Sequence, residues 1–194
     1  MKKFFLILTM VVTIAFIACN DNATSNETST TKTDTRTETN NNVDSKDKNT
    51  IDKIIAEYLN LKNALTDDNA NGAANAAKAI NQSLASVDES ALTAEQKKIY
   101  DEVKDDIKEH AEHIASNGSN IGHQREHFEL LSSDITDIIK TFGSSQTLYK
   151  DFCPMYNNKK GAYWISETKE IKNPYYGKEM LKCGEVKEEM KAKE

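Results

Sequence analysis

Apolar side chains recur through residues 51–142 with the spacing of amphipathic helices. They return every three or four positions, which places them on one face of a helix that turns every 3.6 residues. Four such segments with short joints predict a mainly α fold, an antiparallel four-helix bundle over residues 51–143. The four apolar stripes are formed by Ile51, Ile54, Ile55, Tyr58, Leu59 and Leu65; by Ala73, Ala76, Ala77, Ile80, Leu84 and Val87; by Ile99, Val103, Ile107 and Ile114; and by Ile121, Phe128, Leu131, Ile135, Ile138, Ile139 and Phe142.

Polar and glycine residues mark the joints between the predicted helices. The first joint is expected over residues 67–72, and the third is the sequence "SNGSN" at residues 116–120. Thr93 stands three residues before Gln96, which is the spacing of a capping box at the start of the third helix. Gly143 is a typical stop for the fourth helix.

The N-terminal 50 residues are expected to lie outside the folded domain. Residues 1–19 combine Lys2 and Lys3 with a long apolar stretch, as in a signal peptide. The following "FIAC" resembles a lipobox, so Cys19 is expected to be lipidated and to anchor the protein in a membrane. Residues 20–50 contain only Ala23 and Val43 as apolar side chains, and this composition predicts a disordered tether. An uncleaved anchor or an ordinary secretory signal is the alternative.

The net charge of the chain excludes some classes of partner. The formal charge is −6, and it becomes −8 when the two lysines of the signal segment are removed. Such acidity argues against nucleic acid and against an anionic lipid surface as partners.

The signal segment indicates that the functional part lies outside the cytoplasm. It is expected to be in the cell envelope, either facing the periplasm or at the cell surface.

Residues 144–194 differ in character from the helical part. They hold both prolines, the only tryptophan and the two remaining cysteines, and their tyrosines are interleaved with Asn, Gly and Pro. This pattern predicts short strands and irregular loops. The segment has too few apolar residues for its own core, so it is expected to pack on one end of the bundle as part of the same domain.

All four histidines lie within residues 110–127. His113 comes just before the predicted turn and His123 just after it, while His110 and His127 each lie about one helical turn further away. An antiparallel hairpin therefore brings the four imidazoles to the same end of the bundle. His110 falls inside the apolar stripe of its helix and is expected to be structural. His113, His123 and His127 are the candidate metal ligands.

An alternative interpretation of the histidines is a zinc peptidase. The sequence "HQREH" at residues 123–127 fits H-x-x-E-H, in which two histidines bind zinc and the glutamate, here Glu126, activates water. The pattern is short, and a small bundle with a tail of about fifty residues offers little room for a third ligand and a substrate cleft. We therefore expect no enzymatic activity.

Four sulfur-bearing residues of the tail are further candidate metal ligands. Cys153 and Met155 are two residues apart and would point to the same side of an extended strand, and Met180 and Cys183 would share a face of a helical turn. Thiolate and thioether ligands favour Cu(I) over zinc, calcium or magnesium, so Zn is the less favoured ion. Outside the cytoplasm, Cys153 and Cys183 could equally form a disulfide. Both interpretations stay open on the sequence.

Several stretches resemble a family of bacterial lipoproteins known as domain of unknown function 3347. They are "AEHI", "HQREHFELLSSD", "LYKDFCPMYNNKKGAYWIS" and "NPYYGKEMLKCGEV", within roughly residues 51–188. Similar domains are attached to periplasmic adaptor subunits of heavy-metal efflux systems, which implies copper or silver handling. Tyr156 departs from the family pattern, which has a small residue after "CPM", and His110 lies outside the pattern. The matching residues are His113, His123, His127, Cys153, Met155, Trp164, Asn173, Pro174, Gly177, Met180 and Cys183.

These observations predict an envelope-facing lipoprotein that binds Cu(I) or Ag(I) and has no catalytic activity. The expected ligands come from the histidine group and from the sulfur residues of the tail, and the expected partner is a metal-efflux adaptor protein. The rival hypothesis is a disulfide-stabilised protein-interaction module that binds no metal.

Overall fold

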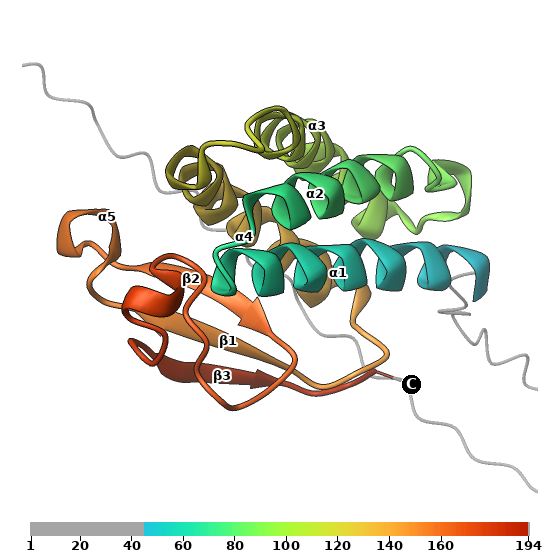
Figure 1. Ribbon diagram of the computed structural model, residues 1–194. Coiled ribbons are helices and arrows are strands. Elements are labelled where there is room, and N and C mark those ends of the chain that lie inside the picture. The colour runs from blue at the N-terminus through green and yellow to red at the C-terminus, as the bar shows by residue number, and fades with distance from the viewer. Residues whose placement is uncertain (1–44, 194) are drawn as a thin grey trace, which may run out of the picture. The chain divides into compact units, whose positions relative to one another are not determined.

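The computed structural model describes residues 45–193 (Figure 1). The expected signal peptide, its Cys19 and the expected tether as far as residue 44 lie outside the described residues. Within the described part the chain is mainly helical and ends in a small antiparallel sheet of three strands. The long helices are α1 (Ser45–Thr66), α2 (Ala70–Leu84), α3 (Ala94–Ser116) and α4 (Ile121–Phe142). The strands are β1 (Leu148–Cys153), β2 (Ala162–Ser166) and β3 (Glu185–Met190), and short helical turns are η1 (Glu89–Ala91), α5 (Tyr156–Lys159) and η2 (Gly177–Glu179).

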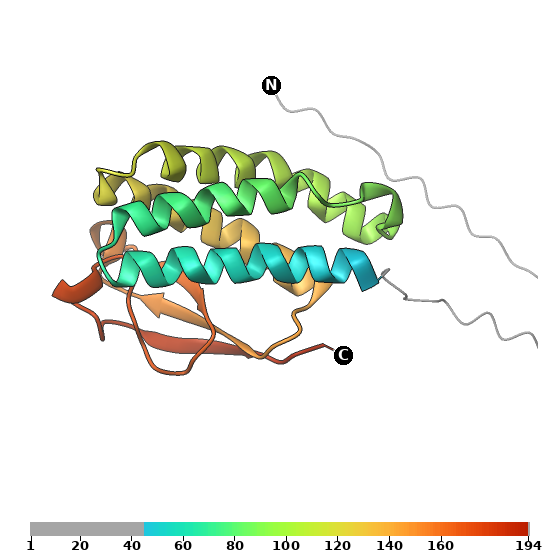
Figure 2. The same ribbon diagram turned by 45° about the vertical axis from the view of Figure 1, so that its right-hand side comes forward.

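The long helices pack in chain order, because each joint is too short to carry the chain far. α1 contacts α2, α2 contacts α3, and α3 contacts α4, while α1 and α4 also touch (Figure 2). Their predicted apolar stripes meet in one core, in which Ile54, Ile80, Ile107 and Ile135 are fully buried. No helix in residues 45–193 is long and apolar enough to cross a membrane.

Helix capping explains where the boundaries differ from those expected. The first joint is shorter than residues 67–72, because the Asn69 side chain accepts a hydrogen bond from Gly72 N at 2.9 Å and starts α2 at Ala70. α1 begins at Ser45, so the last six residues of the expected tether are helical. Adding residues to an existing helix is cheap, since each fixed residue gains a hydrogen bond. The predicted capping box is confirmed, with Thr93 and Gln96 bonded reciprocally.

The strand order in the sheet is β2-β1-β3, so β1 is central. One face of the sheet packs against the helices, because β2 contacts both α4 and α1. In both ribbon views the strands run beneath α1 (Figures 1 and 2). The expectation that the tail packs on one end of the helices is therefore corrected: the sheet covers the side that α1 and α4 form. Trp164 and Ile165 are fully buried there, so the sheet completes the core.

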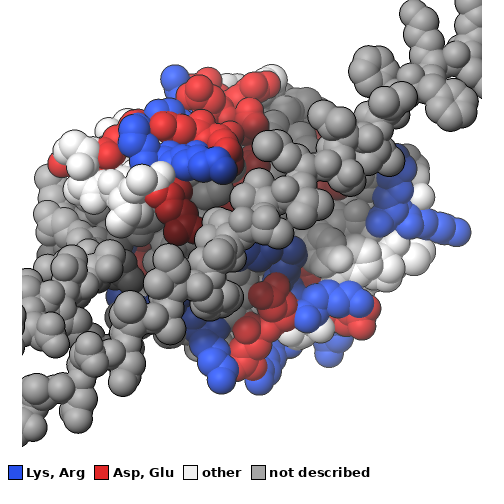
Figure 3. Space-filling model, turned by 180° about the vertical axis from the view of Figure 1, so that it is seen from behind, with Lys and Arg blue, Asp and Glu red and all other residues white. Residues whose placement is uncertain are grey.

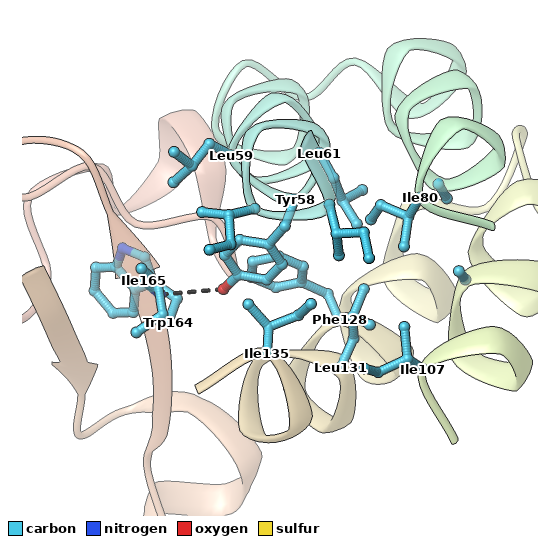
Figure 4. Close-up of a cluster of buried hydrophobic side chains, with 14 of the residues drawn as sticks. Tyr58, Leu59, Leu61, Ile80, Ile107, Phe128, Leu131, Ile135, Trp164 and Ile165 are labelled. Atoms are coloured by element: carbon cyan, nitrogen blue, oxygen red, sulfur yellow. Dashed lines mark hydrogen bonds between the residues drawn. The ribbon is translucent and has the colours of Figure 1, made fainter. Parts of the chain in front are cut away.

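A buried tyrosine joins the sheet to the helices. The Tyr58 hydroxyl on α1 accepts a hydrogen bond from Ile165 N at 3.1 Å (Figure 4). It shares a second hydrogen bond with Ser132 Oγ at 2.8 Å. The Tyr58 ring stacks on Phe128 with centroids 5.3 Å apart. One side chain thus satisfies a backbone amide of β2 that the helices would otherwise leave buried and unbonded.

Candidate metal centre

Three imidazoles from two helices converge at the α3–α4 turn. His113 lies in the last turn of α3, and His123 and His127 lie in the first two turns of α4. Each offers one ring nitrogen such that the three atoms lie within 4.8 Å of one another. The rings of His113 and His127 stack with centroids 4.2 Å apart, and His123 meets His127 edge-on at 4.6 Å. The three histidines named from the sequence are therefore brought together.

Amide side chains fix the turn that carries the cluster. Asn120 caps α4 by accepting a hydrogen bond from His123 N at 3.2 Å, and Asn117 donates one to the carbonyl of His113 at 2.8 Å. The fully buried Gln124 donates to the carbonyls of Ile114 at 3.1 Å and Ala70 at 3.0 Å. The bonds to His123 N and to the carbonyls of His113 and Ile114 occupy groups that a helix end leaves free, so the backbone on both sides of the turn is held in place.

Two of the three rings have a polar partner on the outside of the cluster. His123 Nδ1 lies 3.1 Å from Glu126 Oε2 on the next turn of α4. His127 Nδ1 lies 3.3 Å from Nδ1 of His110, which comes from α3. His113 Nε2 is 4.0 Å from Glu109 Oε1, beyond hydrogen-bond distance. A metal-ligating histidine needs such outer contacts to fix its tautomer and ring orientation.

Burial keeps the more enclosed imidazoles neutral. Desolvation lowers the pKa of His127, and the neighbouring His113, His123 and His110 lower it further. Desolvation also lowers the pKa of His110, against the opposing pull of Glu109 and Asp106. Neutral imidazole is the form that binds a metal ion, so His127 is ready for coordination near neutral pH.

Arg125 connects the cluster's helix to the C-terminal segment. Its guanidinium donates to the carbonyls of Pro174 at 2.8 Å and Leu65 at 3.0 Å, and it pairs with Asp68 at 2.7 Å. Asp68 also accepts a hydrogen bond from Lys178 N at 3.2 Å. The pKa of Asp68 is lowered, chiefly by its hydrogen bond with Arg125. The end of α1, the start of α4 and the loop before β3 are thereby tied together.

The two thiols form a separate pair. Sγ of Cys153, at the end of β1, lies 3.6 Å from Sγ of Cys183, and both cysteines are free. Cys153 is fully buried and Cys183 is partly exposed. Desolvation, together with the hydrogen bond and charge of Cys153, raises the pKa of the Cys183 thiol. Within residues 48–193, the group that could hold a metal contains the three histidines and neither thiol.

The two candidate methionines, Met155 and Met180, lie at the surface. Met155 is 42% exposed and Met180 is 38% exposed, whereas Cys153 is buried. β1 ends at Cys153, since the following Pro154 has no N–H for the strand ladder. The sequence had predicted that Cys153 and Met155 share one side of an extended strand. They do not, because the strand ends at Cys153. Met180 lies beyond the end of η2, and its carbonyl accepts a hydrogen bond from Cys183 N at 2.9 Å.

The remaining residues of the C-terminal pattern shape the loop that ends at Cys183. Asn173 is fully buried, its Oδ1 accepts from Tyr175 N at 2.8 Å, and its Nδ2 donates to the Cys183 carbonyl at 2.6 Å. Gly177 has φ of +54°, and a side chain there would collide with Asp68 and Arg125. Trp164 and Tyr175 are buried packing residues, with rings 6.0 Å apart.

Sequence reasoning missed the polar residues that hold the cluster. Gln124 and Arg125 lie between two of the candidate ligands, and the sequence gives them no role beyond spacing those ligands. In the structure both are hydrogen-bonded to other helices. The contact between His110 and His127 spans 17 residues. The only sequence signal for it is the position of His110 in the apolar stripe of its helix. Such pairings depend on the rotation of α3 against α4.

Residues 54–147 match the model of a family described as a protein of unknown function (DUF3347). The match supports the assignment of this segment to that domain family. The segment runs from α1 through α4 and includes the three clustered histidines, and it ends before both cysteines. Among curated proteins and solved structures, none matches the chain.

Proposed function

We propose that this protein binds a metal ion, copper in the first place, through His113, His123 and His127. The observation that carries the proposal is the convergence of three imidazole nitrogens within 4.8 Å at a rigidly capped turn. Ligand nitrogens around one ion with bonds of about 2.0 Å lie about 3.5 Å apart, so small ring rotations would close the site. We also propose that α1 to α4 form the antiparallel four-helix bundle that supports it.

Ligand chemistry supports copper without requiring the tail. Imidazole suits copper, and copper binds nitrogen sites more tightly than other divalent first-row metals, while Cu(I) and Ag(I) accept low coordination numbers. Zinc is the main competitor, because three histidines also hold catalytic zinc. We propose that the sulfur residues of the tail form a separate group around the thiol pair, since the described contacts join the two thiols to each other. This group consists of Cys153, Met155, Met180 and Cys183.

A binding role is proposed in preference to catalysis. Glu126 would be the general base of a zinc peptidase, yet its carboxylate contacts His123 Nδ1 at 3.1 Å. Its side chain is 71% exposed. A carboxylate on a ligand's outer nitrogen orients the ring and raises its basicity, which is a supporting role.

The cellular setting is proposed from the sequence. The N-terminal 19 residues and Cys19 favour a lipoprotein anchored in the cell envelope, facing the periplasm or the cell surface. A metal-efflux adaptor is the proposed partner, on the family resemblance. Nucleic acid is not proposed, because the chain carries a charge of −6 and the described side chains in Figure 3 mix acidic and basic residues.

The test is an anaerobic Cu(I) titration of the chain from Asn20 onward against a chromophoric Cu(I) chelator. We expect one tight site in the wild type and a loss of at least about 100-fold in affinity for His123→Ala, because a three-ligand site becomes a two-ligand site. Lys108→Ala, an exposed position on α3, is the matched control. Equal affinities in wild type and His123→Ala would overturn the proposal.

The second candidate function is a disulfide-stabilised interaction module. The 3.6 Å separation of the two thiols favours it, and in this alternative the protein binds no metal. In that case the outer face of the sheet, with Tyr163 packed on Phe152 at 4.6 Å, would be the recognition surface. Thiol counting on protein isolated from the envelope tests it, and two free thiols per chain would contradict it.

A further inference from the structure

His110 lies behind the histidine cluster without being part of it. It projects from α3, half-buried, and its ring centroid is 5.4 Å from that of His127 at a tilt of 46°. Its Nδ1 lies 3.3 Å from Nδ1 of His127. The group of converging ligand atoms contains His113, His123 and His127 but leaves His110 out. His110 therefore contacts one candidate ligand through that ligand's Nδ1.

Two imidazole nitrogens at this distance can share one proton. A neutral imidazole has one N–H donor and one bare acceptor nitrogen, so one ring must donate and the other accept. When a metal occupies one nitrogen of His127, the remaining proton of that ring must sit on the other nitrogen. A proton on His127 Nδ1 can be donated only to a His110 Nδ1 that carries none.

We propose that His110 is a positioning residue: it accepts a hydrogen bond from His127 Nδ1–H and thereby presents His127 Nε2 to the metal. This inference rests on the proposed metal site. His123 has the same arrangement, with Glu126 at its Nδ1. Both candidate ligands of α4 are thus held from behind at Nδ1, which leaves both Nε2 atoms for one ion. His113 stacks on His127 at 4.2 Å and limits rotation of that ring.

Two substitutions separate this role from packing. His110→Asn places an amide oxygen close to the position of Nδ1 and keeps an acceptor for His127, whereas His110→Leu keeps an apolar body of similar size and removes the acceptor. Loss of an outer hydrogen-bond partner typically weakens metal binding about 10–100-fold. We expect His110→Leu to lose Cu(I) affinity by that factor and His110→Asn to lose less than about 3-fold. The melting temperatures of the two metal-free variants should not rank in the same order as their Cu(I) affinities.

The direct measurement is ¹⁵N NMR of the histidine rings in the Cu(I)-loaded wild type, kept anaerobic. The expected result is a protonated Nδ1 and a metal-bound Nε2 in His127, with no metal-bound nitrogen in His110. A metal shift on His110 Nδ1 would make it a fourth ligand and overturn the positioning role. Unchanged Cu(I) affinity in His110→Leu would overturn this inference alone. A wild type that binds no Cu(I) would overturn the proposed function together with it.

Discussion

Sγ of Cys153 lies 3.6 Å from Sγ of Cys183, although 30 residues separate them in the chain. β1 brings the first thiol to its end, and the loop that Asn173 closes brings the second, through the bond between Asn173 Nδ2 and the Cys183 carbonyl at 2.6 Å. The backbone thus places the two side chains in contact before any covalent bond forms. Little movement separates the dithiol from a disulfide.

The first prediction is that oxidation of this pair stabilises the domain. A disulfide that closes a loop of 30 residues is expected to add about 3–4 kcal/mol to the free energy of unfolding, because it restricts the unfolded chain. Thermal unfolding with and without a reductant measures the difference. The double variant Cys153→Ser with Cys183→Ser is the control and should unfold at the same temperature in both buffers. If the wild type unfolds at the same temperature with and without the reductant, its thiols have stayed reduced and the prediction is wrong.

The second prediction concerns coupling within the histidine cluster. His113→Ala and His127→Ala should each weaken Cu(I) binding, and the double variant should lose less than the sum of the two, by about 0.5–3 kcal/mol. Ligands of one ion depend on each other, so their effects are not additive. Met155→Ala combined with His127→Ala should instead be additive, because we propose that the exposed Met155 belongs to the separate sulfur group. Non-additivity of that pair would place the thioether at the same ion.

The third prediction tests the bond between the helices and the sheet. Tyr58→Phe leaves the buried Ile165 N–H without its acceptor and should lower the free energy of unfolding by about 1–3 kcal/mol. Urea denaturation measures this loss. Tyr163→Phe is the matched control, since this tyrosine is 44% exposed and its change should stay within about 0.5 kcal/mol. Equal effects of the two substitutions would contradict the assigned role of the Tyr58 hydroxyl.

The fourth prediction is a pH dependence caused by Asp151. This residue lies fully buried in β1, and neither carboxyl oxygen has a hydrogen-bond partner in the described part of the chain. Burial raises its pKa to about 7, against the attraction of Lys62. Between about pH 4 and 7 the unfolded chain therefore releases a proton that the folded chain keeps, so stability falls as the pH rises.

Asp151→Asn should remove that decline. We expect the variant to be more stable than the wild type at pH 8, by about 4 kcal/mol, and equal to it near pH 3, where both states hold the proton. Chemical denaturation at several pH values measures the difference. Asp105→Asn, at an exposed position of α3, should follow the wild-type curve. A parallel pH profile for Asp151→Asn and wild type would refute the assignment.

Much of the helical part follows from the sequence, because its signals are local. The period of the apolar residues, the capping box at Thr93 and the stop at Gly143 each act within a few residues, and the structure has them as predicted. Asn69 shows the limit of that reasoning. It caps α2 and so shortens the predicted joint. The sequence pattern does not reveal this, because asparagine is typical both of helix caps and of loops.

The sequence by itself determined which imidazoles could meet. His113 and His123 flank one short turn and His127 follows one helical turn later, so any hairpin of these two helices brings them close. Only the tertiary structure decided the contact of His110 with His127, the pairing of the two thiols and the place of the sheet along α1 and α4. These depend on how packed elements rotate and slide against each other. Side-chain packing over the whole core sets that choice, and no local pattern records it.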